Sequence, residues 1–188
     1  QNEELKRRDK LSELLNPYLD KILLAVQEYN KIVNSNIYIT HSSMEKWLLE
    51  FKDLYNDTLK AYDKVASISN ENHIAIQKFL NSYKSFTVDR IRLNDVFVEA
   101  ELKYYHIFFE LEVTPILDTQ QRRAVIIDED VNLVIAGAGT GKTTTIIGKL
   151  AYLKNKLNIT PSQILALSFT KKSASDLSSS IQPLGFNA

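Results

Sequence analysis

The stretch VNLVIAGAGTGKTT, residues 131–144, decides the fold of this 188-residue chain. It contains an apolar run of strand length, a glycine loop, and the start of an amphipathic segment that extends to about Leu157. A second apolar run of strand length, residues 164–168, follows a turn at Thr160 and Pro161. The order strand, loop, helix, strand is typical of a parallel α/β sheet. We therefore expect the C-terminal part of the chain to be the first part of a P-loop α/β domain.

The glycine loop, AGAGTGKT at residues 136–143, has the pattern of a phosphate-binding site. Its glycines let backbone N–H groups turn inward around phosphates, and the helix that begins there adds partial positive charge. Lys142 is expected to reach the β- and γ-phosphates and Thr143 to place its hydroxyl on Mg²⁺, so both would serve catalysis. The residues expected to contact the nucleotide are Ala136, Gly137, Ala138, Gly139, Thr140, Gly141, Lys142, Thr143 and Thr144. The loop indicates a nucleoside triphosphate but does not choose its base.

The first 111 residues contain no glycine and a single proline, and their apolar residues recur at helical spacing. We expect helices over residues 3–15 and 17–33, separated at Asn16 and Pro17, and then an extended link over 37–40. Ser42 and Glu45 have the spacing of a capping box for the next helix. Apolar stripes follow at Trp47, Leu48, Phe51, Leu54, Tyr55, Leu59, Tyr62 and Val65, at Ile74, Ile76, Phe79, Leu80 and Tyr83, and over residues 91–109.

The stripes favour a helical bundle core, with a partner-binding helical arm as the alternative. The composition changes near residue 113, so we predict a helical domain over residues 1–111 and the α/β part over 112–188. Two strands and two helices bury little apolar surface. The strands are therefore expected either to rest on the helical half or to lie partly exposed.

The composition excludes several classes of protein. The formal net charge is zero, so no overall positive field indicates nucleic acid, and any DNA contact must be local. There is no cysteine, which excludes a disulfide framework and a thiolate metal site. No apolar run reaches membrane-spanning length, and we expect a soluble, cytoplasmic protein. Three scattered histidines (His41, His73 and His106) lack metal-ligand spacing, and the acidic turn at residues 128–130 is expected to face solvent.

Two segments that flank the glycine loop indicate the class of P-loop protein. Upstream, LDTQQRRAV at residues 117–125 resembles the Q motif of superfamily 1 helicases, in which the amide of Gln121 would pair with adenine and select ATP. Downstream, LSFTKKSA at residues 167–174 resembles helicase motif Ia. There Phe169 would stack on an unpaired base, while Thr170 and Lys171, or Lys172, contact phosphate. Lys171 stands where that group often has asparagine, which leaves the polar contact open.

Three ordered motifs make residues 112–188 resemble the UvrD/Rep/PcrA group of superfamily 1 helicases, most closely the DNA helicase IV group. The resemblance implies a RecA-like α/β domain behind the helical domain, with ATP and Mg²⁺ as cofactors and single-stranded or duplex DNA as partner. It also implies ATP-dependent unwinding, with 3′ to 5′ polarity. The Walker B aspartate, a glutamate and an arginine finger are expected beyond Ala188. We therefore expect this chain alone to bind ATP weakly and not to hydrolyse it.

Two other functions are alternatives to a DNA helicase. The first is a related ATPase that remodels a protein partner, such as RNA polymerase, through residues 1–111. The second is a P-loop kinase or transporter ATPase, which the segments around Gln121 and Phe169 disfavour.

Overall fold

The computed structural model describes residues 2–62 and 71–186, with side chains described for residues 17–62 and 72–186. The chain forms two compact units, Gln1–Asp95 and Val96–Ala188. This division falls inside the long helix α4 (Glu71–Tyr104), earlier than the predicted change of domain near residue 112. The boundary of the helicase-like domain stays a prediction.

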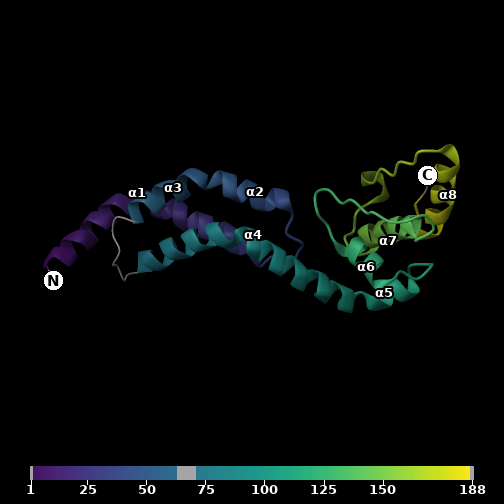
Figure 1. Cartoon of the computed structure of the whole chain (residues 1–188), viewed down its shortest axis with the longest axis horizontal. Helices are drawn as coiled ribbons and strands as arrows, with labels where there is room; N and C mark the ends of the chain where they lie inside the picture. The colour runs from purple at the N-terminus through teal and green to yellow at the C-terminus, as the bar shows by residue number, and fades with distance from the viewer. Residues whose placement is uncertain (1, 63–70, 187–188) are drawn as a thin grey trace. The chain divides into compact units, whose positions relative to one another are not determined.

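The first unit is helical, as predicted. Its elements are α1 (Asn2–Val33), α2 (His41–Glu50), α3 (Lys52–Tyr62) and the first part of α4. Figure 1 shows α1, the α2–α3 run and the start of α4 lying side by side. Their shared core consists of Ile22, Ala25, Val26, Ile39, Met44, Trp47, Phe51, Leu54, Ile76, Phe79, Leu80 and Phe86.

Trp47 lies at the centre of this core, with 3% of its surface exposed. Its ring centroid is 5.4 Å from that of Phe86 and 5.7 Å from that of Tyr29. Its indole Nε1 donates a hydrogen bond of 3.1 Å to the carbonyl oxygen of Ala25 in α1. A buried indole N–H needs such a partner, so this bond fixes α2 against α1.

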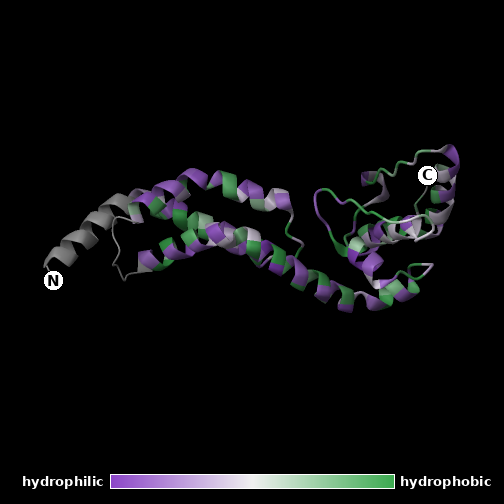
Figure 2. Cartoon of the chain, viewed as in Figure 1, coloured by the Kyte–Doolittle hydropathy of each residue, from purple (hydrophilic) through white to green (hydrophobic). Residues whose placement is uncertain are grey.

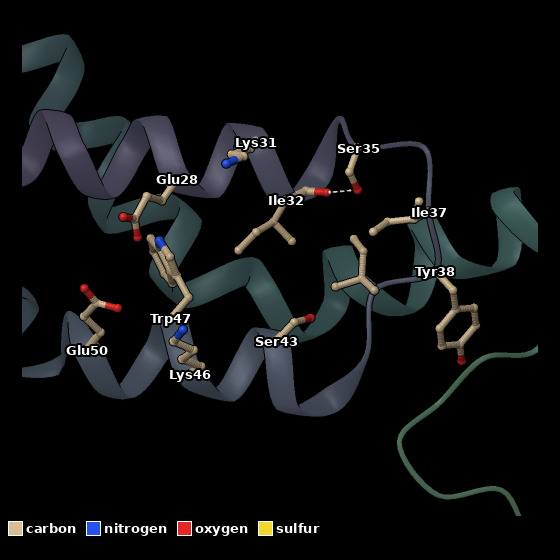
Figure 3. Close-up of a pocket in the computed structure, with 11 residues that line it drawn as sticks. Glu28, Lys31, Ile32, Ser35, Ile37, Tyr38, Ser43, Lys46, Trp47 and Glu50 are labelled. Atoms are coloured by element: carbon tan, nitrogen blue, oxygen red, sulfur yellow. Dashed lines mark hydrogen bonds between the residues drawn. The ribbon is translucent and has the colours of Figure 1, made fainter. Parts of the chain in front are cut away.

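The extended link between α1 and α2 is held to α4 by a buried asparagine. Asn94 accepts a hydrogen bond from the Ile39 N–H (2.8 Å), and its Nδ2 donates to the Ile39 carbonyl (2.9 Å). The link also borders a cavity of about 570 Å³ between the end of α1 and α2, which Ile32 and Trp47 help to line (Figure 3). The Asn94 side chain thus satisfies the backbone of a segment that no regular structure pairs.

Several predicted details of this unit were wrong. Helix α1 continues through Pro17 instead of ending at Asn16; an interior proline costs about 3 kcal/mol through a lost hydrogen bond and a ring clash, which the rest of this 32-residue helix offsets. Helix α2 is capped by Thr40, whose Oγ1 accepts from the Ser43 N–H at 3.2 Å; Ser42 lies inside the helix.

The predicted apolar stripe from Trp47 is not one helix, because Phe51 separates α2 from α3. Of the stripe residues in α4, Ile74 is 66% exposed and lies outside the core. Val65 lies outside the described residues.

The second unit contains the last turns of α4 and the helices around the glycine loop. These are α5 (His106–Leu111), α6 (Thr119–Ile126), α7 (Lys142–Asn155), the short helix η1 (Pro161–Gln163), α8 (Lys171–Ile181) and η2 (Gln182–Leu184). Gly148 of α7 packs closely against α6 and the residue before its cap, because an added Cβ would lie 3.3 Å from Val125 Cγ2 and 2.7 Å from Leu117 Cδ1. Leu150, Ile181 and Phe186 form a smaller core between α7 and α8.

The two predicted strands, residues 131–135 and 164–168, are not strands in this structure. No strand is assigned within residues 2–62 or 71–186. Val131, Leu133 and Ile135 are 84%, 83% and 87% exposed, and Leu165 and Leu167 are similarly exposed. A strand is defined by ladder hydrogen bonds to a neighbour, which apolar sequence alone does not provide. Both segments are exposed within their own unit.

No helix in the described part of the chain is long and apolar enough to cross a membrane. The long helix α4 instead carries polar and apolar residues side by side along its length (Figure 2).

Candidate nucleotide-binding site

The glycine loop adopts a backbone that suits an anion. Gly139 and Gly141 have φ values of +75° and +86°, the left-handed region that side chains disfavour. Gly141 is the N-cap of α7, and no side chain of the described residues caps this helix start. The first N–H groups of a helix lack intrahelical partners, so those of α7 are open to an acceptor from outside the helix.

The side chain of Lys142 folds back over the same loop. Its Nζ donates hydrogen bonds to the carbonyl oxygens of Ala136 (3.2 Å) and Gly137 (2.6 Å). The hydroxyl of Thr140 also donates to Gly137 O, at 2.9 Å. Thr143 follows on the first turn of α7, with its side chain exposed. The ammonium group therefore lies at the loop, where a phosphate would compete with carbonyl oxygens for its protons.

Gln121 joins the upstream motif to the glycine loop. Its Oε1 accepts from the Asp118 N–H (2.9 Å), and Asp118 Oδ1 accepts from the Gln121 N–H (2.8 Å), which together form the capping box of α6. Its Nε2 donates to the carbonyl oxygen of Thr140 at 3.0 Å. This cap has a sequence signature that went unused above, an aspartate three residues before a glutamine.

The acidic turn, residues 128–130, contacts α7 through Asp128. Lys149 of α7 donates to the Ile127 carbonyl (3.0 Å) and to Asp128 Oδ1 (3.1 Å). Asp128 and Asp130 are exposed, as predicted, and the half-exposed carboxylate of Asp128 also ties the end of α6 to α7.

The three predicted DNA contacts lie at the start of α8. Phe169 is completely exposed, so its ring is available for stacking instead of contributing to a core. Thr170 is the N-cap of α8, and its Oγ1 accepts from the Ser173 N–H at 3.1 Å. Lys171 is exposed on the first turn. The hydroxyl of Thr170 therefore has a structural role, which the sequence comparison did not anticipate.

The histidines make separate local contacts. His41 lies 3.8 Å from Glu45, His73 lies 3.4 Å from the Tyr62 hydroxyl, and His106 contacts the Lys103 carbonyl at 3.0 Å. Within the described ranges, no group of three or more histidine, aspartate or glutamate side chains is placed to hold a metal ion.

Comparison with known proteins relates this site to a helicase family. Residues 117–186, which include the Gln121 segment, the glycine loop and Phe169, match the model of the UvrD/REP helicase N-terminal domain. This segment is therefore similar to that domain. The match begins at the capping segment of α6 and ends beyond η2.

Individual helicases are similar over parts of the same chain. DNA helicase IV of Escherichia coli is 37% identical over 94 residues, which are 50% of this chain and 14% of that protein. A probable DNA helicase II homolog of Mycoplasma genitalium is 49% identical over 61 residues, 32% of this chain and 9% of the relative. The ATP-dependent DNA helicase PcrA of Staphylococcus aureus is 37% identical over 68 residues, 36% of this chain and 9% of its own length. The chain thus covers about a tenth of the length of these relatives, and no solved structure matches it significantly.

Proposed function

We propose that this chain is the ATP-binding front part of an ATP-dependent DNA helicase that acts in the cytoplasm. The observation that carries the proposal is the hydrogen bond from Gln121 to Thr140, which brings the candidate adenine-selecting side chain onto the candidate phosphate loop. A P-loop alone fits many nucleotide-binding proteins, whereas this pairing fits a site that reads both ends of ATP. The names of the relatives, all DNA helicases, favour this function over partner remodelling.

The loop residues fit the phosphates of ATP. There is open space beside Gly139, since an added Cβ there would meet no atom within 4 Å. Lys142 is the cation at the loop, and Ala136–Thr144 supply the backbone N–H groups. Thr143 would hold Mg²⁺ through its hydroxyl, because the residue after the P-loop lysine has that place in such sites. Bound Mg·ATP would supply the free energy of hydrolysis that drives unwinding.

Gln121 is proposed to select adenine. A primary amide has two N–H donors and two acceptor lone pairs, and the hydrogen bonds of the Gln121 amide to Asp118 and Thr140 use one of each. The remaining N–H and lone pair match an adenine edge, which offers both an acceptor and a donor.

We further propose that residues 131–135 and 164–168 are strands of a RecA-like sheet in a protein of the relatives' length. The exposed apolar side chains of both segments support this, because such runs are stable in water only when neighbouring strands and helices cover them. In such a sheet, Phe169 and Lys171 follow the carboxyl end of a strand, where α/β domains place their ligands.

A binding experiment tests the DNA part of the proposal. Fluorescence anisotropy of a labelled single-stranded oligonucleotide is measured with the wild-type chain, with F169A and with Y104A. Tyr104 is a matched control because it is an exposed aromatic residue, 76% accessible, in α4. We expect F169A to weaken binding by about tenfold, since stacking on one base contributes about 1–3 kcal/mol, and Y104A to have no effect. Equal loss in both variants would refute the role of Phe169.

A further inference from the structure

The last turns of α4 precede the segment matched by the helicase family, yet they are built into the unit that contains the glycine loop. Val98 is 2% exposed. Immediately after α4, the rings of Tyr105 and Phe109 lie 5.7 Å and 6.4 Å from the ring of Tyr152, at interplanar angles of 86° and 8°. Tyr105, the N-cap of α5, and Phe109 within α5 therefore pack against one side chain of α7.

A hydrogen bond links this same side chain to α4. The hydroxyl of Tyr152 donates to Glu101 Oε2 at 2.9 Å, and Tyr152 is only 1% exposed. Burial, reinforced by the bond to Glu101, raises the pKa of Tyr152 far above its ordinary value. The Tyr152 hydroxyl therefore stays protonated, and able to donate, throughout the physiological range. Hydrogen bonds to a charged acceptor are stronger than neutral ones, so this contact holds α7 firmly.

A second carboxylate of α4 contacts the other helix of the site. Glu99 forms an ion pair with Arg123 of α6, two residues after Gln121. Both side chains are at least one-third exposed, so water and salt weaken this pair, and alone it stabilises little. The pair matters for position, because two acidic residues two positions apart in α4 contact the two helices whose starts hold the nucleotide-binding groups.

We propose that Glu101 is a positioning residue for nucleotide binding. By holding Tyr152 it fixes α7, the helix that begins at Lys142, at the distance from α6 that the bond between Gln121 and Thr140 requires. Glu99 contributes the weaker contact to α6. This inference rests on the proposed ATP site, and it extends the functional unit upstream to the end of α4.

The test uses the 188-residue chain and a fluorescent N-methylanthraniloyl derivative of ATP with Mg²⁺. We expect E101A to raise the Kd by about fivefold, the lower end of usual coupling between sites. E101Q is expected to recover most of the affinity, because its amide oxygen still accepts from Tyr152. D95N removes an exposed carboxylate from the same helix and should leave the Kd unchanged. The effects of E101A and Y152F should not add, because each removes the same bond.

Hydrogen exchange without nucleotide gives a second readout. We expect E101A, but not D95N, to speed amide exchange in α6 and in the first turns of α7. If E101A does not fold, E101Q combined with Y152F replaces it in both measurements. Unchanged Kd and exchange in E101A, or in its replacement E101Q/Y152F, would overturn the inference, as would additive effects of E101A and Y152F. A wild-type chain that binds no nucleotide would overturn the proposed function, and exchange would then decide the role of Glu101 separately.

Discussion

Gln121 Nε2 lies 3.0 Å from the carbonyl oxygen of Thr140 and donates a hydrogen bond to it. The same amide completes the capping box of α6 through Asp118. The Gln121 side chain therefore connects the first turn of α6 to the glycine loop. If Thr140 moves when nucleotide binds, the Gln121 side chain must move with it or the hydrogen bond between them must break.

The first prediction concerns the choice of base. Replacing Gln121 by alanine removes the groups proposed to read adenine, so Q121A should reduce the preference for ATP over GTP by about tenfold, the value of one hydrogen bond to a buried partner. Competition of ATP and GTP against the fluorescent ATP analogue measures this ratio. Q121E keeps the acceptor of the capping box but cannot donate to Thr140, and it serves as the matched variant. A wild-type ratio in Q121A would show that Gln121 only caps α6.

Substituting two glycines of the loop distinguishes the effect of backbone strain from the effect of the contact with Gln121. Both Gly139 and Gly141 have positive φ, but an added Cβ meets no atom within 4 Å at Gly139, whereas at Gly141 it lies 2.6 Å from Gln121 Nε2. Both G139A and G141A should therefore weaken nucleotide binding through strain. G141A should raise the Kd about fivefold more, since steric conflict costs about 1 kcal/mol beyond the strain. Equal effects of the two substitutions would argue against the Gln121 contact.

The two hydrogen bonds between Asn94 and Ile39, in the link between α1 and α2, predict an effect on the free energy of unfolding. N94A leaves the buried N–H of Ile39 without an acceptor, which should cost about 2 kcal/mol of unfolding free energy. R90A is the matched control, because Arg90 Nε also donates to Ile39 O and its removal leaves Asn94 bonded to both Ile39 groups. Urea unfolding followed by the fluorescence of Trp47, the single tryptophan, reports this unit. The account fails here if R90A is as destabilising as N94A.

A tyrosine in the same core predicts how stability changes in alkali. Burial, together with a hydrogen bond of 3.0 Å to Asp89, raises the pKa of Tyr29 to about 12. Below pH 10 the phenol is protonated in both folded and unfolded chains, so its contribution is fully present. Between pH 10 and about 12 only the unfolded chain ionises, and stability falls. In Y29F this part of the loss should disappear, as followed by Trp47 fluorescence across that range; an identical pH profile in Y29F would contradict the assignment.

Sequence reasoning predicted the helical half and the glycine loop because both depend on local patterns, namely helical spacing without glycine and a fixed motif. It could not predict that α1 continues through Pro17, because the break depends on whether packing compensates for one lost bond. It also missed the contact between Glu101 and Tyr152, which joins residues 51 positions apart and has no sequence signature. The two apolar runs were predicted as strands, but strand pairing requires a partner that composition does not specify.

The central claim is that the glycine loop binds ATP through Lys142. Isothermal titration calorimetry of Mg·ATP into the 188-residue chain tests it most directly, with K142A as the test variant and K60A, an exposed lysine of α3, as the control. The account predicts weak but saturable binding at one site in the wild type and in K60A, and at least about tenfold weaker binding in K142A, because the phosphates lose their closest cation. No binding by the wild-type chain, or equal affinity in K142A, would contradict it.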